Sequence, residues 1–135
     1  KANVYIDQVD CYGKTALIHA CENGMYDVVG ALIATGKCRP ECADDNCKTA
    51  LIHACYQKES EIALALIRLN NGAHGYGDSD ERTPLIYACM NRMQHVALAL
   101  IKTGKSNPKQ VDEYGNTALT YAIQNNMTSV IALLS

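Results

Sequence analysis

Seven cysteines give this 135-residue chain its widest choice of chemistry. Three of them lie in apolar segments that recur along the chain, at Cys21, Cys55 and Cys89. A cysteine in such a segment acts as a small hydrophobic side chain, and a thiol in apolar surroundings is a poor nucleophile. We therefore expect these three cysteines to pack in the core.

The other cysteines fall in polar, turn-rich segments, at Cys11, Cys38, Cys42 and Cys47. Four thiols near one another could bind a structural zinc ion, although Cys-x3-Cys-x4-Cys is not a standard zinc spacing. A disulfide such as Cys38–Cys42 is a second possibility. We favour reduced surface thiols without a bound metal, and a scaffold with a zinc site in this loop stays open as an alternative.

Histidine is the other candidate for acid–base chemistry. His19 and His53 occupy equivalent places in a repeated motif, where Tyr87 and Tyr121 also fall. A place that accepts both kinds of ring favours packing between helices over proton transfer. His53 is close in sequence to Cys55, but a catalytic thiolate needs a partly exposed, electropositive site, whereas Cys55 is expected to face the core. The chain also lacks the glycine-rich strings that cradle phosphate, so we predict no catalytic residue, no metal and no cofactor.

Aspartate recurs five residues before the threonine of each repeated motif, at Asp10, Asp44, Asp78 and Asp112. Asp45 and Asp80 lie beside two of these positions, so a cation site is conceivable. However, short acidic side chains commonly accept hydrogen bonds from the backbone amides of a turn. The regular loop position favours this turn role over metal binding.

These residues are organised by an internal repeat of 34 residues. Similar segments begin at Thr15, Thr49, Thr83 and Thr117, and the first three continue as Ala or Pro, Leu, Ile, a ring residue, Ala and Cys. A second apolar segment follows each of them in step, at 28–33, 62–67, 96–101 and 130–134. A fixed period of this length indicates a stacked repeat architecture.

Each copy predicts two short helices and a long loop. Threonine is a good N-cap, and residues 16–23 carry apolar side chains at helical spacing up to Gly24. A second helix is expected over 26–35, with Val28, Leu32 and Ile33 directed inward, before a turn-rich stretch over 37–48. Helices this short are not stable alone in water, so the copies must stack, with equivalent leucines and alanines forming the core.

The motif Asp-x-x-Gly-x-Thr-[Ala/Pro]-Leu, followed by a leucine-rich second helix ending in glycine, resembles the ankyrin repeat. The resemblance covers nearly the whole chain. It implies an all-α, ankyrin-like solenoid of stacked helix-turn-helix pairs with protruding loops. It also implies a non-catalytic protein that binds other proteins.

The chain departs from the family pattern in several places. The signature proline is present only as Pro84, and isoleucine or threonine occupies the signature histidine position. The loop glycine is kept at Gly13 and Gly115 but is replaced by Cys47 and Glu81. We therefore expect the loop turns of the second and third repeats to differ from the others.

The repeat divides the chain into parts of a single domain over 1–135. Residues 1–10 are read as the trailing loop of an incomplete repeat, followed by repeats over 11–44, 45–78 and 79–112 and a partial repeat over 113–135. A free-standing array needs polar capping repeats for solubility, and none is evident. We expect the chain to be an excerpt of a longer array or of a multidomain protein.

The binding surface is expected along one concave strip, which we call the contact strip. Stacking leaves the loop tips and the ends of the first helices on this strip, where side chains are free to vary between copies. Tyrosine, methionine and arginine are enriched at interface centres. The predicted partner-binding residues are Tyr12, Lys14, Glu22, Asn46, Lys48, Tyr56, Gln57, Asp80, Arg82, Met90, Tyr114 and Asn116. An alternative is that the chain is the targeting or regulatory array of a larger enzyme.

Composition restricts the partners and the compartment. The net charge is −2 without a basic block, which argues against nucleic acid and against an anionic membrane surface. The longest apolar run, over 62–67, is far below the roughly 20 residues that a membrane span requires. An odd number of cysteines without a secretion signal favours a reducing compartment. We expect an intracellular, cytoplasmic monomer that binds a protein.

Overall fold

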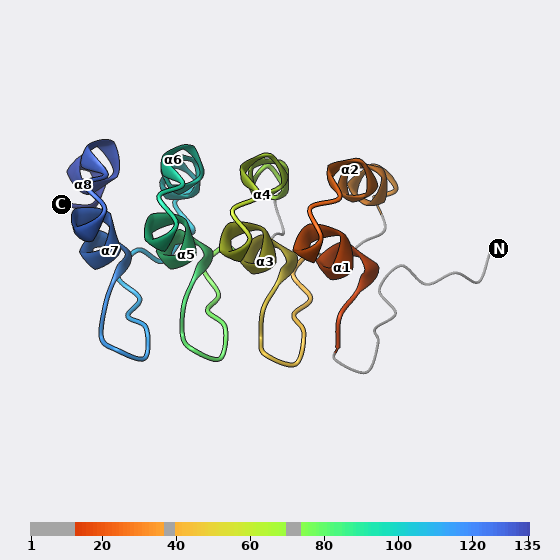
Figure 1. Cartoon of the computed structure of the whole chain (residues 1–135), viewed down its shortest axis with the longest axis horizontal. Helices are drawn as coiled ribbons and strands as arrows, with labels where there is room; N and C mark the ends of the chain where they lie inside the picture. The colour runs from red at the N-terminus through yellow and green to blue at the C-terminus, as the bar shows by residue number, and fades with distance from the viewer. Residues whose placement is uncertain (1–12, 37–39, 70–73) are drawn as a thin grey trace.

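The computed structural model describes residues 13–36, 40–69 and 74–135. These residues form four helical hairpins in a row (Figure 1). The first helix of each hairpin spans Ala16–Glu22 (α1), Ala50–Tyr56 (α3), Pro84–Met90 (α5) or Ala118–Gln124 (α7). The second spans Tyr26–Ala34 (α2), Ser60–Ile67 (α4), Gln94–Lys102 (α6) or Thr128–Leu134 (α8). The predicted all-α repeat solenoid is confirmed for the described part of the chain.

The hairpins form two helical layers. Helices α1, α3, α5 and α7 pack side by side in one layer, and α2, α4, α6 and α8 form the other. Each helix also contacts the other helix of its own hairpin. Figure 1 shows two-armed loops projecting from the first layer, on the side away from the second. We call the loops over 43–49, 77–83 and 111–117 the second, third and fourth fingers.

Threonine starts each helix of the first layer, as the sequence predicts. The Thr15 hydroxyl accepts a hydrogen bond from the Ile18 amide at 3.2 Å, and Thr49, Thr83 and Thr117 cap their helices in the same way. Pro84 occupies the first helical position, where its missing N–H costs nothing. The turn into each second helix has a left-handed residue, which is Gly24 in the first hairpin.

The finger turns do not differ from one another, contrary to the expectation from the missing glycines. In each of the three fingers the turn begins at the aspartate, and the backbone amide three residues later donates a hydrogen bond to the aspartate carbonyl. These bonds join Cys47 to Asp44, Glu81 to Asp78 and Gly115 to Asp112. The φ of the donor residue is +63° at Cys47, +63° at Glu81 and +79° at Gly115. Such a left-handed residue after a type I turn closes a short hairpin. Neighbouring contacts therefore impose the glycine conformation on two residues that disfavour it.

The core lies between the layers and along the stack. Cys21, Cys55 and Cys89 are fully buried, as predicted, beside an alanine from each first helix. Small side chains at these places allow neighbouring helices to approach closely.

One part of the predicted core is wrong. Val28 is 39% exposed, whereas Val29 is fully buried. The residues equivalent to Val28 are buried because the preceding hairpin covers them, and no described hairpin precedes α2. Leu32 is likewise only partly buried, whereas its equivalents Leu66 and Leu100 are fully buried. Ile33 is also only partly buried, as is its equivalent Ile101.

Within the described residues, none of the helices has the length and apolar character needed to cross a bilayer.

The strained finger turns generate a stability prediction. Cys47→Gly and Glu81→Gly should each raise the free energy of unfolding by about 0.5–1 kcal/mol, because relief of left-handed strain of about 1–2 kcal/mol outweighs the greater freedom of glycine in the unfolded chain. Urea unfolding followed by circular dichroism measures the change.

The matched control is Asn46→Gly, one residue away in the same turn. Asn46 is not among the residues with positive φ. Glycine there should lower the unfolding free energy. If Asn46→Gly and Cys47→Gly changed the free energy of unfolding equally, the backbone of Cys47 would not be strained.

Candidate functional site

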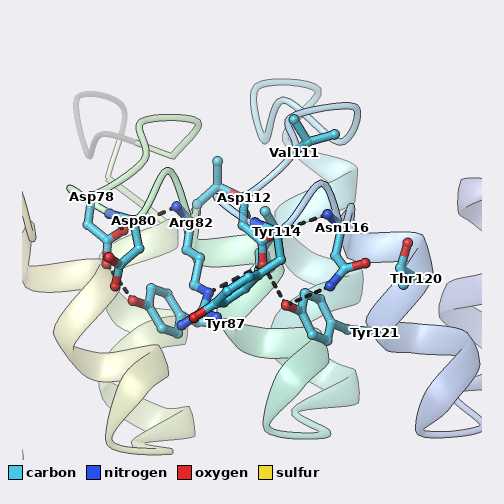
Figure 2. Close-up of polar contacts among 12 residues, drawn as sticks. Asp78, Asp80, Arg82, Tyr87, Val111, Asp112, Tyr114, Asn116, Thr120 and Tyr121 are labelled. Atoms are coloured by element: carbon cyan, nitrogen blue, oxygen red, sulfur yellow. Dashed lines mark hydrogen bonds and ion pairs between the residues drawn. The ribbon is translucent and has the colours of Figure 1, made fainter.

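Each described finger is organised around one buried aspartate. In the third finger, Asp78 Oδ1 accepts hydrogen bonds from the amides of Asp80 at 2.9 Å and Arg82 at 3.1 Å. Its other carboxylate oxygen accepts a short hydrogen bond from the hydroxyl of Tyr87, which lies on α5 (Figure 2). One carboxylate thus accepts hydrogen bonds from the amides of its own turn and also links the finger to the helix that follows.

The same arrangement recurs in the second and fourth fingers. Asp44 Oδ1 accepts from the amides of Asn46 and Lys48, and Asp44 Oδ2 lies 2.8 Å from His53 Nε2. In the fourth finger, Asp112 Oδ2 accepts from the Tyr121 hydroxyl at 2.5 Å. The predicted turn role of these aspartates is confirmed. His53, Tyr87 and Tyr121 do more than pack, since each is the hydrogen-bond partner of an aspartate nine residues earlier. The packing expected for His19 between helices is wrong, because this side chain is exposed on α1.

These contacts decide the charge state of the carboxylates. Burial raises the pKa of Asp112, but hydrogen bonds from Tyr121, from two turn amides and from Arg82 outweigh it, so the pKa lies below the ordinary value. Burial likewise raises the pKa of Asp44, and His53 and the turn amides lower it further than burial raises it. Both groups therefore stabilise the fold as carboxylates, and that stabilisation is present above their ordinary pKa and lost as the pH falls through the lowered value.

A basic side chain of one finger forms an ion pair with the buried carboxylate of the following finger. Lys48 Nζ lies 3.3 Å from Asp78 Oδ2, and Arg82 Nε lies 3.4 Å from Asp112 Oδ2. The side chains of both aspartates are fully buried. Figure 2 shows the Arg82 side chain passing between the rings of Tyr87 and Tyr114, whose centroids lie 6.0 and 5.7 Å from its guanidinium carbon. The carboxylates consequently link successive repeats as well as each finger to its helix.

Backbone contacts fix the spacing of the repeats further. The Ser79 amide donates to the Asn46 carbonyl at 3.0 Å, and the Glu113 amide donates to the Asp80 carbonyl at 3.1 Å. At the opposite end of the first helices, the Asn91 side chain donates to the Cys55 carbonyl at 2.8 Å, and Asn125 does the same for Cys89. These bonds satisfy helix C-terminal carbonyls from the neighbouring repeat.

A polar groove of about 310 Å³ lies between the fingers and the ends of the first helices. Its floor includes an edge-to-face pair of rings, with the centroids of Tyr56 and Tyr87 5.7 Å apart. Lys48 Nζ stands 5.9 Å from the centre of the Tyr56 ring. The lining residues are Lys14, Glu22, Asp44, Asn46, Lys48, His53, Tyr56, Gln57, Asp80, Arg82 and Tyr87.

The structure brings most of the predicted partner-binding residues together in this groove. Those that line it are Lys14, Glu22, Asn46, Lys48, Tyr56, Gln57, Asp80 and Arg82. Met90, Tyr114 and Asn116 are not among its lining residues, and Asn116 bonds to Asp112 and to the Tyr121 hydroxyl. Tyr12 lies outside the described residues. Sequence reasoning missed Asp44, His53 and Tyr87 as lining residues, although their constant nine-residue separation was a usable signal.

The thiols offer little chemistry in the described part of the chain. Burial raises the pKa of Cys55, with Cys89 and Cys21 adding to the effect, and burial raises the pKa of Cys89 to about 12. These thiols stay neutral at physiological pH, so the pairing of His53 with Cys55 provides no nucleophile. Cys42 is partly buried and Cys47 is exposed, while Cys11 and Cys38 lie outside the described residues. The described histidines, cysteines, aspartates and glutamates contain no group of three or more that could hold a metal ion.

A family model described as ankyrin repeats (3 copies) matches the chain over residues 2–76 and 68–135. Among curated proteins, none matches the chain significantly.

The finger carboxylates yield a second stability prediction. Asp78→Ala should lower the free energy of unfolding by about 3–5 kcal/mol, because it removes one partner of a buried ion pair and leaves turn amides and a tyrosine hydroxyl unsatisfied. Asp80→Ala, two residues away, should change it by less than about 0.5 kcal/mol, because this carboxylate has no hydrogen-bond or ion-pair partner among the described residues. Chemical unfolding of both variants checks the difference, and similar losses would argue against the special role of Asp78.

Proposed function

The chain belongs to the ankyrin repeat family, whose members are generally protein–protein interaction modules, and we propose that it is a non-catalytic adaptor that binds a protein partner along the contact strip. The groove between the fingers and the first-layer helices is the observation that carries this proposal. It gathers polar, charged and aromatic side chains from three successive repeats on one face.

The exposed tyrosines support a protein as the ligand. Tyr56 is 54% exposed and Tyr114 is 69% exposed. Both rings already lie against charged or aromatic neighbours, Tyr56 beside Tyr87 and Tyr114 beside Arg82. Tyrosine provides a large contact area with few rotatable bonds, so little side-chain entropy is lost when a partner covers it.

The residues of the contact strip divide into two roles. Lys48 and Arg82 join neighbouring repeats through buried carboxylates, so replacing them would disturb the scaffold as well as the surface. Gln57 occupies the place of Asn91 and Asn125 but makes no side-chain hydrogen bond with the rest of the described chain. Tyr56, Gln57 and Tyr114 are therefore the side chains best suited to contact a partner without holding the fold.

The proposal predicts the effect of removing the exposed rings. Tyr56→Ala combined with Tyr114→Ala should weaken partner binding at least about tenfold, because aromatic anchors contribute most to interface energies. Quantitative affinity capture with mass spectrometry identifies the partner, and titration calorimetry with that purified partner measures the loss.

The matched control replaces Tyr26 and Tyr76 by alanine. These rings are 49% and 67% exposed but lie on α2 and in the loop before the third finger, outside the contact strip to which Tyr56 and Tyr114 belong. Circular dichroism must show that both double variants fold. The proposal is contradicted if the two double variants bind the same partner equally well.

A further inference from the structure

We propose that the groove takes a basic segment of its protein partner, and that an arginine or lysine of this segment pairs with the carboxylate of Asp80. This inference rests on the proposed function and adds the chemistry of the partner to it.

The basic side chains that line the groove all have ion-pair partners within the protein, but one acidic lining side chain has none among the described residues. Every lining cation has a carboxylate partner: Lys14 Nζ lies 2.7 Å from Glu22, Lys48 pairs with Asp78 and Arg82 pairs with Asp112. Asp44 is matched by His53 at 2.8 Å. The cations are thus neutralised by the protein itself and offer little to an anionic ligand.

Asp80 is the lining carboxylate that lacks such a partner. Its backbone amide donates to Asp78 and its carbonyl accepts from Glu113, but its side chain makes no hydrogen bond or ion pair within the described ranges. It is partly buried at the groove, and Figure 2 shows it on the third finger together with Arg82. A partly desolvated carboxylate without a counter-ion favours a cation supplied from outside.

The turns of the fingers add further negative charge. The turn segments 44–47, 78–81 and 112–115 contain no lysine or arginine. Their exposed acidic residues are Asp45, Glu81 and Glu113, and none has an ion-pair partner in the described structure. Unpaired carboxylates on neighbouring fingers produce a negative potential that attracts basic segments and repels phosphate groups.

The floor of the groove suits the apolar part of such a side chain. The ring of Tyr56 lines the groove and forms an edge-to-face pair with Tyr87. Arginine stacks on aromatic faces and forms two parallel hydrogen bonds to a carboxylate, so it can use Tyr56 and Asp80 together. Of the two basic residues, arginine therefore fits the groove better than lysine.

The test selects random 12-residue peptides displayed on phage against the chain in low-salt buffer. Peptides are kept if the Tyr56→Ala, Tyr114→Ala variant no longer binds them. The proposal predicts arginine or lysine at one fixed position of the enriched sequences. The dissociation constant of a synthetic consensus peptide should rise about tenfold for Asp80→Asn but less than about twofold for Asp45→Asn, because Asp45 on the neighbouring finger contributes only long-range attraction.

A charge exchange gives an independent readout. Asp80→Lys should lose the consensus peptide and recover binding to the same peptide with glutamate at the basic position. A merely structural role for Asp80 would not produce this recovery.

The outcomes separate this inference from the proposed function. Peptides that depend on Tyr56 and Tyr114 but have no basic position would overturn the inference and leave the adaptor function intact. Equal affinity of wild type and Asp80→Asn for the consensus peptide would do the same. If no selected peptide depends on Tyr56 and Tyr114, the contact strip is not a peptide-binding surface, and both proposals fail.

Discussion

The buried finger carboxylate is the interaction on which the rest of the structure depends. Asp78 makes the full set of contacts. One carboxylate oxygen accepts hydrogen bonds from two turn amides, and the other accepts one from the Tyr87 hydroxyl and pairs with Lys48 of the preceding finger. A carboxylate without these partners would be costly to bury, and the partners without the carboxylate would be unsatisfied. The finger, the first helix of its hairpin and the preceding repeat are thereby joined at one point.

These contacts of the buried carboxylate explain how short helices can form a groove with side chains in fixed positions. Each first-layer helix spans only seven residues, too short to persist alone. The carboxylates, the hydrogen bonds between finger backbones and the asparagines at the helix ends hold these helices at fixed spacing. A groove assembled from three repeats can then present its side chains in fixed positions, which lowers the entropic cost of binding a partner.

Much of the fold could be predicted from the sequence, because the 34-residue period places threonine caps, alanines and leucines at equivalent positions. The prediction failed where neighbours decide the outcome. Val28 follows the pattern of buried residues, yet it lies at the end of the described stack and is exposed. Cys47 and Glu81 lack the freedom of glycine, yet cooperative contacts hold them in the same turn. The variable surface positions indicated most of the groove, but the repeated aspartates and rings were read separately, and their pairing became visible only in the structure.

A double-mutant cycle on Lys48 and Asp78 tests the joint between repeats most directly. The free energy of unfolding is measured for the wild type, Lys48→Met, Asp78→Asn and the double variant. If the carboxylate couples successive repeats, the two substitutions are non-additive, with a coupling energy of about 1–3 kcal/mol. Additivity within about 0.5 kcal/mol would show that the contact at 3.3 Å does not link the repeats energetically, and it would contradict this account.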